Sequence, residues 1–293
     1  MLKLDNVTKV YRVGAFGGKT LTAVGDVSFD VRPGEVVSLI GESGSGKSTI
    51  GKMILGLTPV TGGSITLDGV PVAPGKEYYR HVQGVFQDPF SCYNPVFKAD
   101  RVFQMIKEAY YPGVSAKDWA VRVNAAVRDV RLDPDQVLGR YPHQLSGGQL
   151  QRLLIARALL LDLKLLIADE ITSMLDASTR IDVLNLLAEL KERGLGVLYV
   201  THDLSLGTYL AERTVVLRHG RVVEMGETDK VFGNPLHPYT RQLLAAVPRL
   251  HASWEEAEPV TDCPYHRGEA SGGLFEAEEG HFVACARLES CPE

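Results

Sequence analysis

The sequence has no apolar run long enough to cross a membrane, which needs about 18 consecutive apolar residues. Even residues 153–168, a mostly apolar stretch, are interrupted by Arg157, Asp162 and Lys164. The first residues also lack a basic segment followed by an apolar one, so we expect no secretion signal. Together these absences predict a cytosolic protein that contacts a membrane only through other subunits.

Blocks of like charge are absent too. Charged residues make up 23% of the chain and the formal net charge is −5. No segment gathers the roughly five or six like charges that are typical of an interaction arm, so we expect no nucleic-acid partner. With 45% apolar residues, the 293-residue chain can fill a core, which predicts a globular protein of one large or two modest domains.

Three short apolar segments predict buried β-strands at residues 36–40, 165–168 and 197–200. Strands that are apolar on both faces and separated by helical stretches are typical of a parallel sheet covered on both sides. A glycine-rich segment and a helical pattern over residues 48–55 follow the first strand. The sequence therefore predicts an α/β fold that contains a strand, loop and helix in this order.

The remaining segments predict additions to this sheet. Between about residues 95 and 160 the strand patterns vanish, and apolar residues recur at helical spacing, which indicates a helical insertion. Residues 215–223 are typical of a closing hairpin around Gly220. A break at residues 234–238 leads into a tail, and we expect a small appendage over residues 251–293.

Residues 41–48 read Gly-Glu-Ser-Gly-Ser-Gly-Lys-Ser and match the phosphate-binding P-loop, in the strand-to-helix context that this loop requires. Its backbone N–H groups point at phosphate oxygens, and the following helix presents its positive end to them. Lys47 is predicted to reach the β and γ phosphates of ATP, and Ser48 to bind Mg²⁺. An ordinary glycine-rich turn is the weaker alternative. The predicted nucleotide-binding residues here are Gly41, Ser43, Gly44, Ser45, Gly46, Lys47, Ser48 and Thr49.

An acidic pair, Asp169 and Glu170, ends the second predicted strand. Asp169 can hold Mg²⁺ directly or through water, and Glu170 can polarise the attacking water as a general base. Adjacent acids at a strand end are often only solvated loop residues. The P-loop upstream favours the catalytic interpretation.

Between these two motifs, residues 145–149 read Leu-Ser-Gly-Gly-Gln, which matches the ABC signature without a mismatch. The chain therefore resembles the nucleotide-binding subunits of ABC transporters. The resemblance implies a P-loop NTPase fold with a RecA-like core and with antiparallel β and α-helical ABC subdomains. It also implies a nucleotide-binding domain over residues 1–233, a helical subdomain at about 95–160, and a C-terminal extension over residues 234–293.

The resemblance also implies roles for single residues. Tyr11 would stack on adenine, and Gln87 would sense Mg²⁺ and join the core to the helical insertion. His202 would hold the γ-phosphate, and Asp176, in a Ser-Met-Leu-Asp loop, would help communication across a dimer. These assignments depend on the family pattern and not on the residue types alone.

Two subunits of this kind would clamp ATP between them. The nucleotide held by Lys47 of one chain would be completed by the signature of the other, namely Ser146, Gly147, Gly148 and Gln149. An isolated chain should then hydrolyse ATP poorly. Two positions depart from the family pattern, with Ile171 in place of proline and Met174 in place of alanine, and neither removes a reacting group.

Residues 87–95 and 235–244 resemble the oligopeptide, dipeptide and nickel importer subfamily. This likeness implies a second, different ATPase subunit, two transmembrane permease subunits and an extracellular solute-binding protein. The chain would then be a peripheral protein on the cytoplasmic face of the cell membrane. Residues 93–98 also resemble oligosaccharide importers, which leaves that cargo as an alternative.

Cysteine is scarce, with four in the chain, and three of them lie near the C-terminus at Cys263, Cys285 and Cys291. They resemble part of a set that holds an iron–sulfur cluster in this subfamily. A [4Fe–4S] cluster takes four thiolates, and the cysteine expected at residues 265–268 is absent. Either His266 or an outside ligand replaces it, or the thiols are free.

Two classes of ABC protein compete with a transporter motor. Non-transport ABC ATPases usually carry two cassettes or long coiled coils, whereas this chain has one cassette and no heptad pattern. A non-catalytic partner subunit would need to lose Lys47, Glu170 or His202, and all three are present. Both alternatives are therefore weaker than an ATP-hydrolysing transporter subunit.

Overall fold

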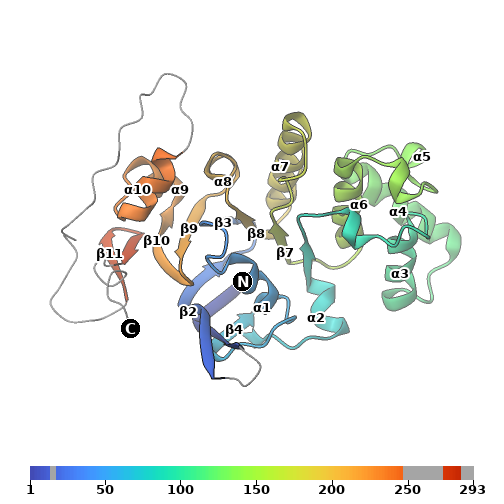
Figure 1. Ribbon diagram of the computed structural model, residues 1–293. Coiled ribbons are helices and arrows are strands. Elements are labelled where there is room, and N and C mark those ends of the chain that lie inside the picture. The colour runs from blue at the N-terminus through green and yellow to red at the C-terminus, as the bar shows by residue number, and fades with distance from the viewer. Residues whose placement is uncertain (14–17, 247–272, 285–293) are drawn as a thin grey trace.

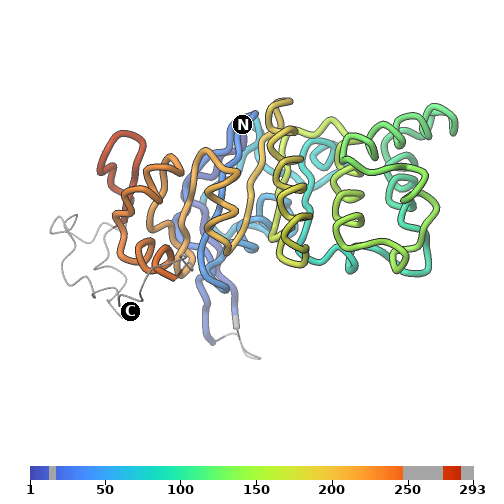
Figure 2. Tube along the Cα trace, turned by 90° about the horizontal axis from the view of Figure 1, so that it is seen from above, coloured from blue at the N-terminus to red at the C-terminus, as the bar shows by residue number. Residues whose placement is uncertain are grey.

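The computed structural model describes residues 1–13, 18–246 and 273–284. This part of the chain forms a large mixed sheet and a smaller antiparallel sheet (Figure 1). A group of helices lies at one end of the molecule, and the C-terminal elements lie at the other (Figure 2). Among these described residues, no helix has the length and apolar character that crossing a membrane requires.

The large sheet is parallel through its centre. Strands β6 (Val82–Val85), β7 (Leu165–Asp169), β8 (Gly196–Thr201), β3 (Val36–Ile40) and β9 (Arg213–Arg218) lie side by side in that order, each parallel to the next. Beyond β9 the sheet continues through antiparallel strands β10 (Arg221–Glu227), β12 (His281–Ala284) and β11 (Leu274–Glu278). The predicted parallel sheet and closing hairpin are confirmed.

Burial on both faces explains why the central strands are apolar without alternation. In β7, Leu165 and Ile167 pack into one core cluster, whereas Leu166 and Ala168 pack into another on the opposite face. Strand β8 divides its side chains in the same way. A strand covered on both sides needs apolar residues at every position, as the sequence predicts.

One face of the large sheet is covered by helix α1 (Lys47–Ile54) and by the antiparallel sheet. That sheet consists of β2 (Lys19–Val31), β1 (Leu2–Val13), β4 (Gly62–Leu67) and β5 (Val70–Pro71) in spatial order. Helix α2 (Lys76–His81) then leads back to β6. The helix after the P-loop is thereby held between two sheets.

Between β6 and β7 the chain contains helices and short turns. These are α3 (Arg101–Tyr110), α4 (Ala116–Asp129), α5 (Pro134–Val137) and α6 (Gly147–Leu159), with single helical turns at 90–92 and 142–144. Buried Phe103, Trp119 and Leu153 belong to the core cluster that these helices share with α7 (Ala177–Glu192). We call this group of helices, α3 to α6, the helical lobe (Figure 1). The exact bounds of a helical subdomain stay a prediction.

The C-terminal part includes α8 (Leu204–Leu210), α9 (Thr228–Gly233) and α10 (Pro238–Ala245). Its last described strand, β12, pairs with β10 and so extends the large sheet. Residues 273–284 therefore form an edge of this sheet, in which β12 pairs with the backbone of β10 and Val283 is buried. The rest of the expected appendage, residues 251–272 and 285–293, lies outside the described part of the chain.

Candidate functional site

The predicted site segments follow four neighbouring parallel strands. The P-loop follows β3, Glu170 follows β7, His202 follows β8 and Gln87 follows β6. Because the carboxyl ends of parallel strands meet at one edge of a sheet, these segments come together there. We call this place the P-loop edge. Its residues line a cavity of about 620 Å³, formed by Gly41, Glu42, Ser43, Ser48, Gln87, Asp169, Glu170, His202 and Leu243.

Two glycines let the P-loop turn tightly against the sheet. A Cβ atom on Gly41 would lie 2.1 Å from the carbonyl oxygen of Leu217, and one on Gly46 would lie 2.6 Å from that of Ala23. Gly46 also has a positive φ of 105°, which side chains disfavour. A second hollow of about 420 Å³ continues along the loop past Lys47 and Thr49. The loop therefore exposes backbone to space on its outer side.

The Lys47 ammonium is held inside the loop. Its side chain is buried, and Nζ donates hydrogen bonds to the carbonyl oxygens of Gly41 at 2.7 Å and Glu42 at 2.8 Å. Burial lowers the pKa of Lys47, while the carboxylates of Glu170, Asp169 and Glu42 oppose that shift. The third N–H of this ammonium can donate to a phosphate oxygen, a charged and therefore stronger acceptor.

Oxygen ligands suited to Mg²⁺ line the same cavity. Ser48 Oγ donates to Asp169 Oδ1 at 3.4 Å, and the amide of Gln87 also lines the cavity. Burial raises the pKa of Asp169, and the nearby Glu170 charge adds to this, while the Ser48 hydrogen bond lowers it. The described residues contain no cluster of three or more His, Cys, Asp or Glu side chains with metal-binding geometry. Hydroxyl, amide and carboxylate oxygens nevertheless fit Mg²⁺, which usually takes one or two carboxylates plus substrate phosphates.

Glu170 and His202 contact each other across the ends of adjacent strands. Glu170 Oε1 lies 3.2 Å from His202 Nδ1, and the Glu170 side chain is only 21% exposed. Glu170 has a positive φ of 51°, which is uncommon for a residue with a side chain. Its N–H donates to Val200 at 2.9 Å, and the next residue, Ile171, is buried. The backbone therefore holds this carboxylate in the cavity at some conformational cost.

The signature residues form a different kind of site, which we call the signature turn, residues 145–149. Ser146 caps helix α6, since its Oγ accepts the N–H of Gln149 while Gln149 Oε1 accepts the N–H of Ser146. A Cβ on Gly148 would lie 2.3 Å from Cγ2 of Thr179 in α7. None of residues 145–149 lines either cavity of the P-loop edge.

Asp176 lies beside this turn, at the cap of α7. Its carboxylate accepts hydrogen bonds from Thr179 N and from the hydroxyls of Ser178 and Thr179. These bonds, led by that of Ser178, lower the pKa of Asp176. Through Thr179, the predicted dimer loop and the signature turn pack directly on each other, whereas neither lines a cavity of the P-loop edge of the same chain.

Tyr11 lies in β1 and does not itself line either of the two cavities. Its ring is partly exposed, and Lys9 Nζ lies 5.0 Å from the ring centroid. Its strand partner Leu21 does line the smaller hollow. The aromatic ring is therefore placed near the nucleotide hollow, and its contact with adenine stays a prediction.

Comparison with known families agrees with this arrangement. The ABC transporter family model matches residues 24–173, which include the P-loop, the signature turn and the acidic pair. A model of the oligopeptide/dipeptide transporter C-terminal region matches residues 223–276. The chain belongs to the ABC transporter family. The predicted family, fold class and ATP-hydrolysing activity are thereby confirmed.

Relatives of this ABC ATPase align over most of its length. The oligopeptide transport ATP-binding protein OppF of Bacillus subtilis is 38% identical over 92% of each chain. The oligopeptide transport ATP-binding protein AmiF of Streptococcus pneumoniae is 40% identical over 91% of this chain and 90% of its own. Among solved structures, the dimeric ATP-binding cassette MJ0796 with ADP and phosphate aligns with a TM-score of 0.69 and 31% identity, covering 78% of this chain and 99% of its own.

The ABC core also contains a link that the sequence analysis missed. Gln151 of α6 is fully buried and its Nε2 donates to the carbonyl oxygen of Phe86 at 3.1 Å. Further along α6, Arg157 Nη2 lies 3.2 Å from Gln83 Oε1. The helix that begins at the signature turn is thereby tied to the segment that carries Gln87. A polar residue within an otherwise apolar helix is the signal that could have indicated it.

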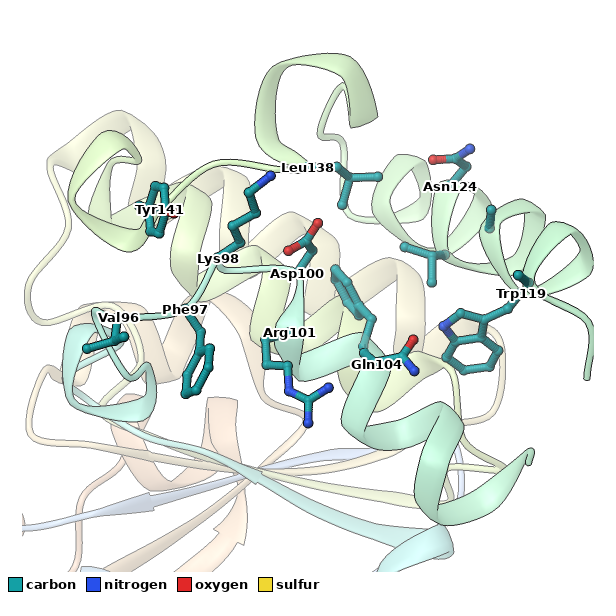
Figure 3. Close-up of a pocket in the computed structure, with 14 residues that line it drawn as sticks. Val96, Phe97, Lys98, Asp100, Arg101, Gln104, Trp119, Asn124, Leu138 and Tyr141 are labelled. Atoms are coloured by element: carbon teal, nitrogen blue, oxygen red, sulfur yellow. The ribbon is translucent and has the colours of Figure 1, made fainter.

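A separate cavity of about 520 Å³ lies in the helical lobe (Figure 3). Lys98 and Asp100 border it from the loop before α3, and Trp119 and Asn124 border it from α4. It shares no lining residue with the two cavities of the P-loop edge. We assign no role to it in nucleotide binding.

The cysteine prediction is not tested by this structure. Cys263, Cys285 and Cys291 lie outside the described residues, and the described cysteine, Cys92, is an exposed free thiol. The iron–sulfur cluster therefore stays a prediction. Iron analysis and a visible spectrum of anaerobically purified protein would test it.

Proposed function

We propose that this chain is one ATPase subunit of an importer that carries oligopeptides or dipeptides across a membrane. The main support for a peptide cargo is the match of residues 223–276 to the oligopeptide/dipeptide transporter C-terminal region. The full-length relatives named as oligopeptide transport ATP-binding proteins support it. No relative named here supports the oligosaccharide alternative.

In the proposed mechanism, ATP enters the P-loop edge and its phosphates accept the third N–H of Lys47, while the carbonyls of Gly41 and Glu42 keep the other two. The loop N–H groups and the start of α1 then surround the β-phosphate, since a helix N-terminus favours anions. Mg²⁺, held by Ser48, Asp169 and Gln87, would supply positive charge against the β and γ phosphates. The side chains thus bind and orient the triphosphate before any bond breaks.

Glu170 is the proposed general base. It would accept a proton from the water that attacks the γ-phosphorus as the bond to the β–γ bridging oxygen breaks and ADP leaves, while His202 beside it orients the γ-phosphate. The 3.2 Å contact between the two side chains supports the proposal that both act on the same γ-phosphate. A base held in place by the backbone needs little rearrangement before the reaction, which favours turnover.

The signature turn is proposed to act on the nucleotide of a second subunit. Ser146 and the start of α6 offer a hydroxyl and N–H groups at a helix N-terminus, a common anion site. Because the turn does not line the P-loop edge of its own chain, the complementary phosphate belongs to a partner ATPase. We propose that this partner is a different chain of the same family, in a heterodimer.

The helical lobe is the proposed contact with the permease. After Gln87 the chain exposes large apolar side chains, namely Phe90, Val96, Phe97 and Met105. Phe97 and Met105 line one hollow, and exposed apolar side chains that gather in this way are typical of a protein interface. Two transmembrane permease subunits would cover these side chains in each transporter and hold the ATPase pair at the cytoplasmic face of the membrane. An extracellular solute-binding protein would deliver the peptide.

Uptake by the assembled transporter tests the cargo. The subunit would be reconstituted in vesicles with its permease and partner ATPase, and labelled peptides would be offered together with the solute-binding protein. We expect ATP-dependent peptide uptake that unlabelled oligosaccharide does not compete away. Accumulation of oligosaccharide but not of peptide would overturn the peptide assignment while leaving the ATPase assignment intact.

A further inference from the structure

Helix α10 lies outside the segment matched to the ABC transporter model, yet it contacts the nucleotide site. Leu243 lines the cavity of the P-loop edge together with Ser48 and Glu170. The hydroxyl of Tyr239, one turn earlier, accepts a hydrogen bond from the N–H of Glu42 at 3.0 Å. Two side chains of this helix therefore reach the P-loop from the C-terminal part of the chain.

Packing fixes the position of the Tyr239 hydroxyl. Tyr239 is only 2% exposed and belongs to a core cluster with Val216, Val223 and Val231. The guanidinium of Arg218 lies 4.8 Å from the centroid of its ring. A ring held by strands β9 and β10 and by helix α9 can place its hydroxyl with little freedom.

The bond matters because of the peptide plane that it holds. The N–H of Glu42 and the C=O of Gly41 belong to one planar peptide unit. The N–H donates to Tyr239 and the C=O accepts from Lys47 Nζ at 2.7 Å. Since a trans peptide points these two groups in opposite directions, the orientation that Tyr239 imposes also aims the carbonyl that holds Lys47.

The turn before α10 is anchored in its own right. Glu224 of β10 is fully buried, and its two carboxylate oxygens accept the N–H groups of Leu236 at 2.8 Å and His237 at 2.9 Å. The same carboxylate contacts Nε2 of buried His281 in β12 at 2.8 Å. The C-terminal elements thus form a continuous chain of contacts from β12 through β10 to the P-loop.

We propose that Tyr239 is a positioning residue of the nucleotide site and that α10 forms one wall of that site. Tyr239 orients the Gly41–Glu42 peptide and, through it, Lys47, while Leu243 borders the space beside Glu170 and His202. The C-terminal elements thereby set how tightly this subunit binds ATP. The inference depends on ATP binding by the ABC core and does not depend on the proposed cargo.

Removal of the hydroxyl tests the positioning role. Tyr239→Phe in the full chain keeps the ring and deletes the bond to Glu42, so we expect the Kd for ATP to rise about three- to tenfold by calorimetry. Tyr78→Phe is the matched control, because the Tyr78 hydroxyl likewise bonds to a backbone group, donating to the carbonyl oxygen of Ile54 at the other end of α1. An ATP affinity of Tyr239→Phe equal to that of the control would overturn the role.

Opposite charges at Leu243 provide a test that does not require the tyrosine variant to fold. Leu243 is half-buried, so Leu243→Lys and Leu243→Glu should cost similar stability. Near bound phosphates, however, lysine should strengthen and glutamate should weaken ATP binding, with Kd values about three- to tenfold apart at low salt. A loss of packing alone would shift both variants in the same direction.

The neighbouring Leu244 supplies the control for this pair. It is also half-buried on α10 but does not line the cavity, so its lysine and glutamate variants should bind ATP alike. Equal affinities for the two Leu243 variants, or an equal separation at Leu244, would overturn the wall assignment. Because peptide uptake is not measured, a wrong cargo would leave these results unaffected.

Discussion

The P-loop edge and the signature turn are two parts of one ATPase that are built in opposite ways. The P-loop edge is a cavity that contains buried charges, with Lys47 only 4% and Asp169 only 8% exposed. The signature turn has an exposed Ser146 and no charged side chain in residues 145–149. The N–H groups of Ser146 and Gln149 are occupied by an internal cap.

This difference indicates where binding energy and turnover reside. Buried charges that are held by neighbouring groups give strong interactions with a triphosphate, so a single chain can bind ATP at the P-loop edge. In the proposed mechanism, a neutral turn at a helix N-terminus adds a weaker interaction with the phosphate of another chain. One subunit would then carry a binding half and a completing half that act on different nucleotides.

The largest expected effect comes from Glu170→Gln. The variant keeps the shape of the side chain but removes the base, so the assembled ATPase pair should turn over at roughly one hundredth of the parent rate or less. ATP should still bind, and the pair should stay closed, as phosphate release and gel filtration with ATP would measure. Glu189→Gln, at a surface ion pair with Arg131, is the control. Equal rates for Glu170→Gln and parent would reject the base.

A second prediction compares the two halves directly. Lys47→Ala should weaken ATP binding by the isolated subunit about tenfold or more, because it deletes a charged donor to the phosphates. Gly148→Ala should leave that affinity unchanged and lower turnover of the pair, since its Cβ would lie 2.3 Å from Thr179 Cγ2. Adding Thr179→Ser removes that methyl group and should restore part of the rate.

One outcome would contradict the distinction between the P-loop edge and the signature turn. If Gly148→Ala weakened ATP binding by the isolated subunit as much as Lys47→Ala does, the signature turn would belong to the site of its own chain. Calorimetry on the single subunit and ATPase rates of the pair separate the two cases. Thr179→Ser alone keeps the hydroxyl that Asp176 accepts, so it serves as the baseline.

Much of the P-loop edge could be predicted because its residues stand at strand ends. Apolar runs indicated β3, β7 and β8, and parallel strands bring the residues after them together. The contact between Tyr239 and Glu42 could not be predicted, since the residues are 197 positions apart and meet only through packing. The same holds for Gly148 against Thr179, where a steric fit decides. In neither case does the sequence around one residue indicate which residue it contacts.

The smallest expected effect is a loss of stability at low pH. It sharpens the comparison because it arises in α10, the helix that contributes to the P-loop edge. His237 caps α10, with Nδ1 accepting the N–H of Tyr239 at 3.1 Å, and burial, aided by Arg218, lowers the pKa of His237 to about 4. A depressed pKa means that the unfolded chain takes up the proton first. Stability from this group is therefore complete above about pH 6.5 and lost as the pH falls towards 4.

His237→Asn separates this titration from general acid effects, because asparagine is a good N-cap that does not ionise. Denaturant unfolding at pH 7 and pH 5 should show that the parent loses about 2 kcal/mol more stability than the variant, because the unfolded histidine takes up a proton in this range while the folded one does not. The parent should also bind ATP less tightly as the pH falls towards 4, where the folded His237 takes up the proton and loses the cap that positions Tyr239. Equal losses of ATP affinity in the two proteins would mean that the P-loop edge, like the signature turn, is independent of the C-terminal helix.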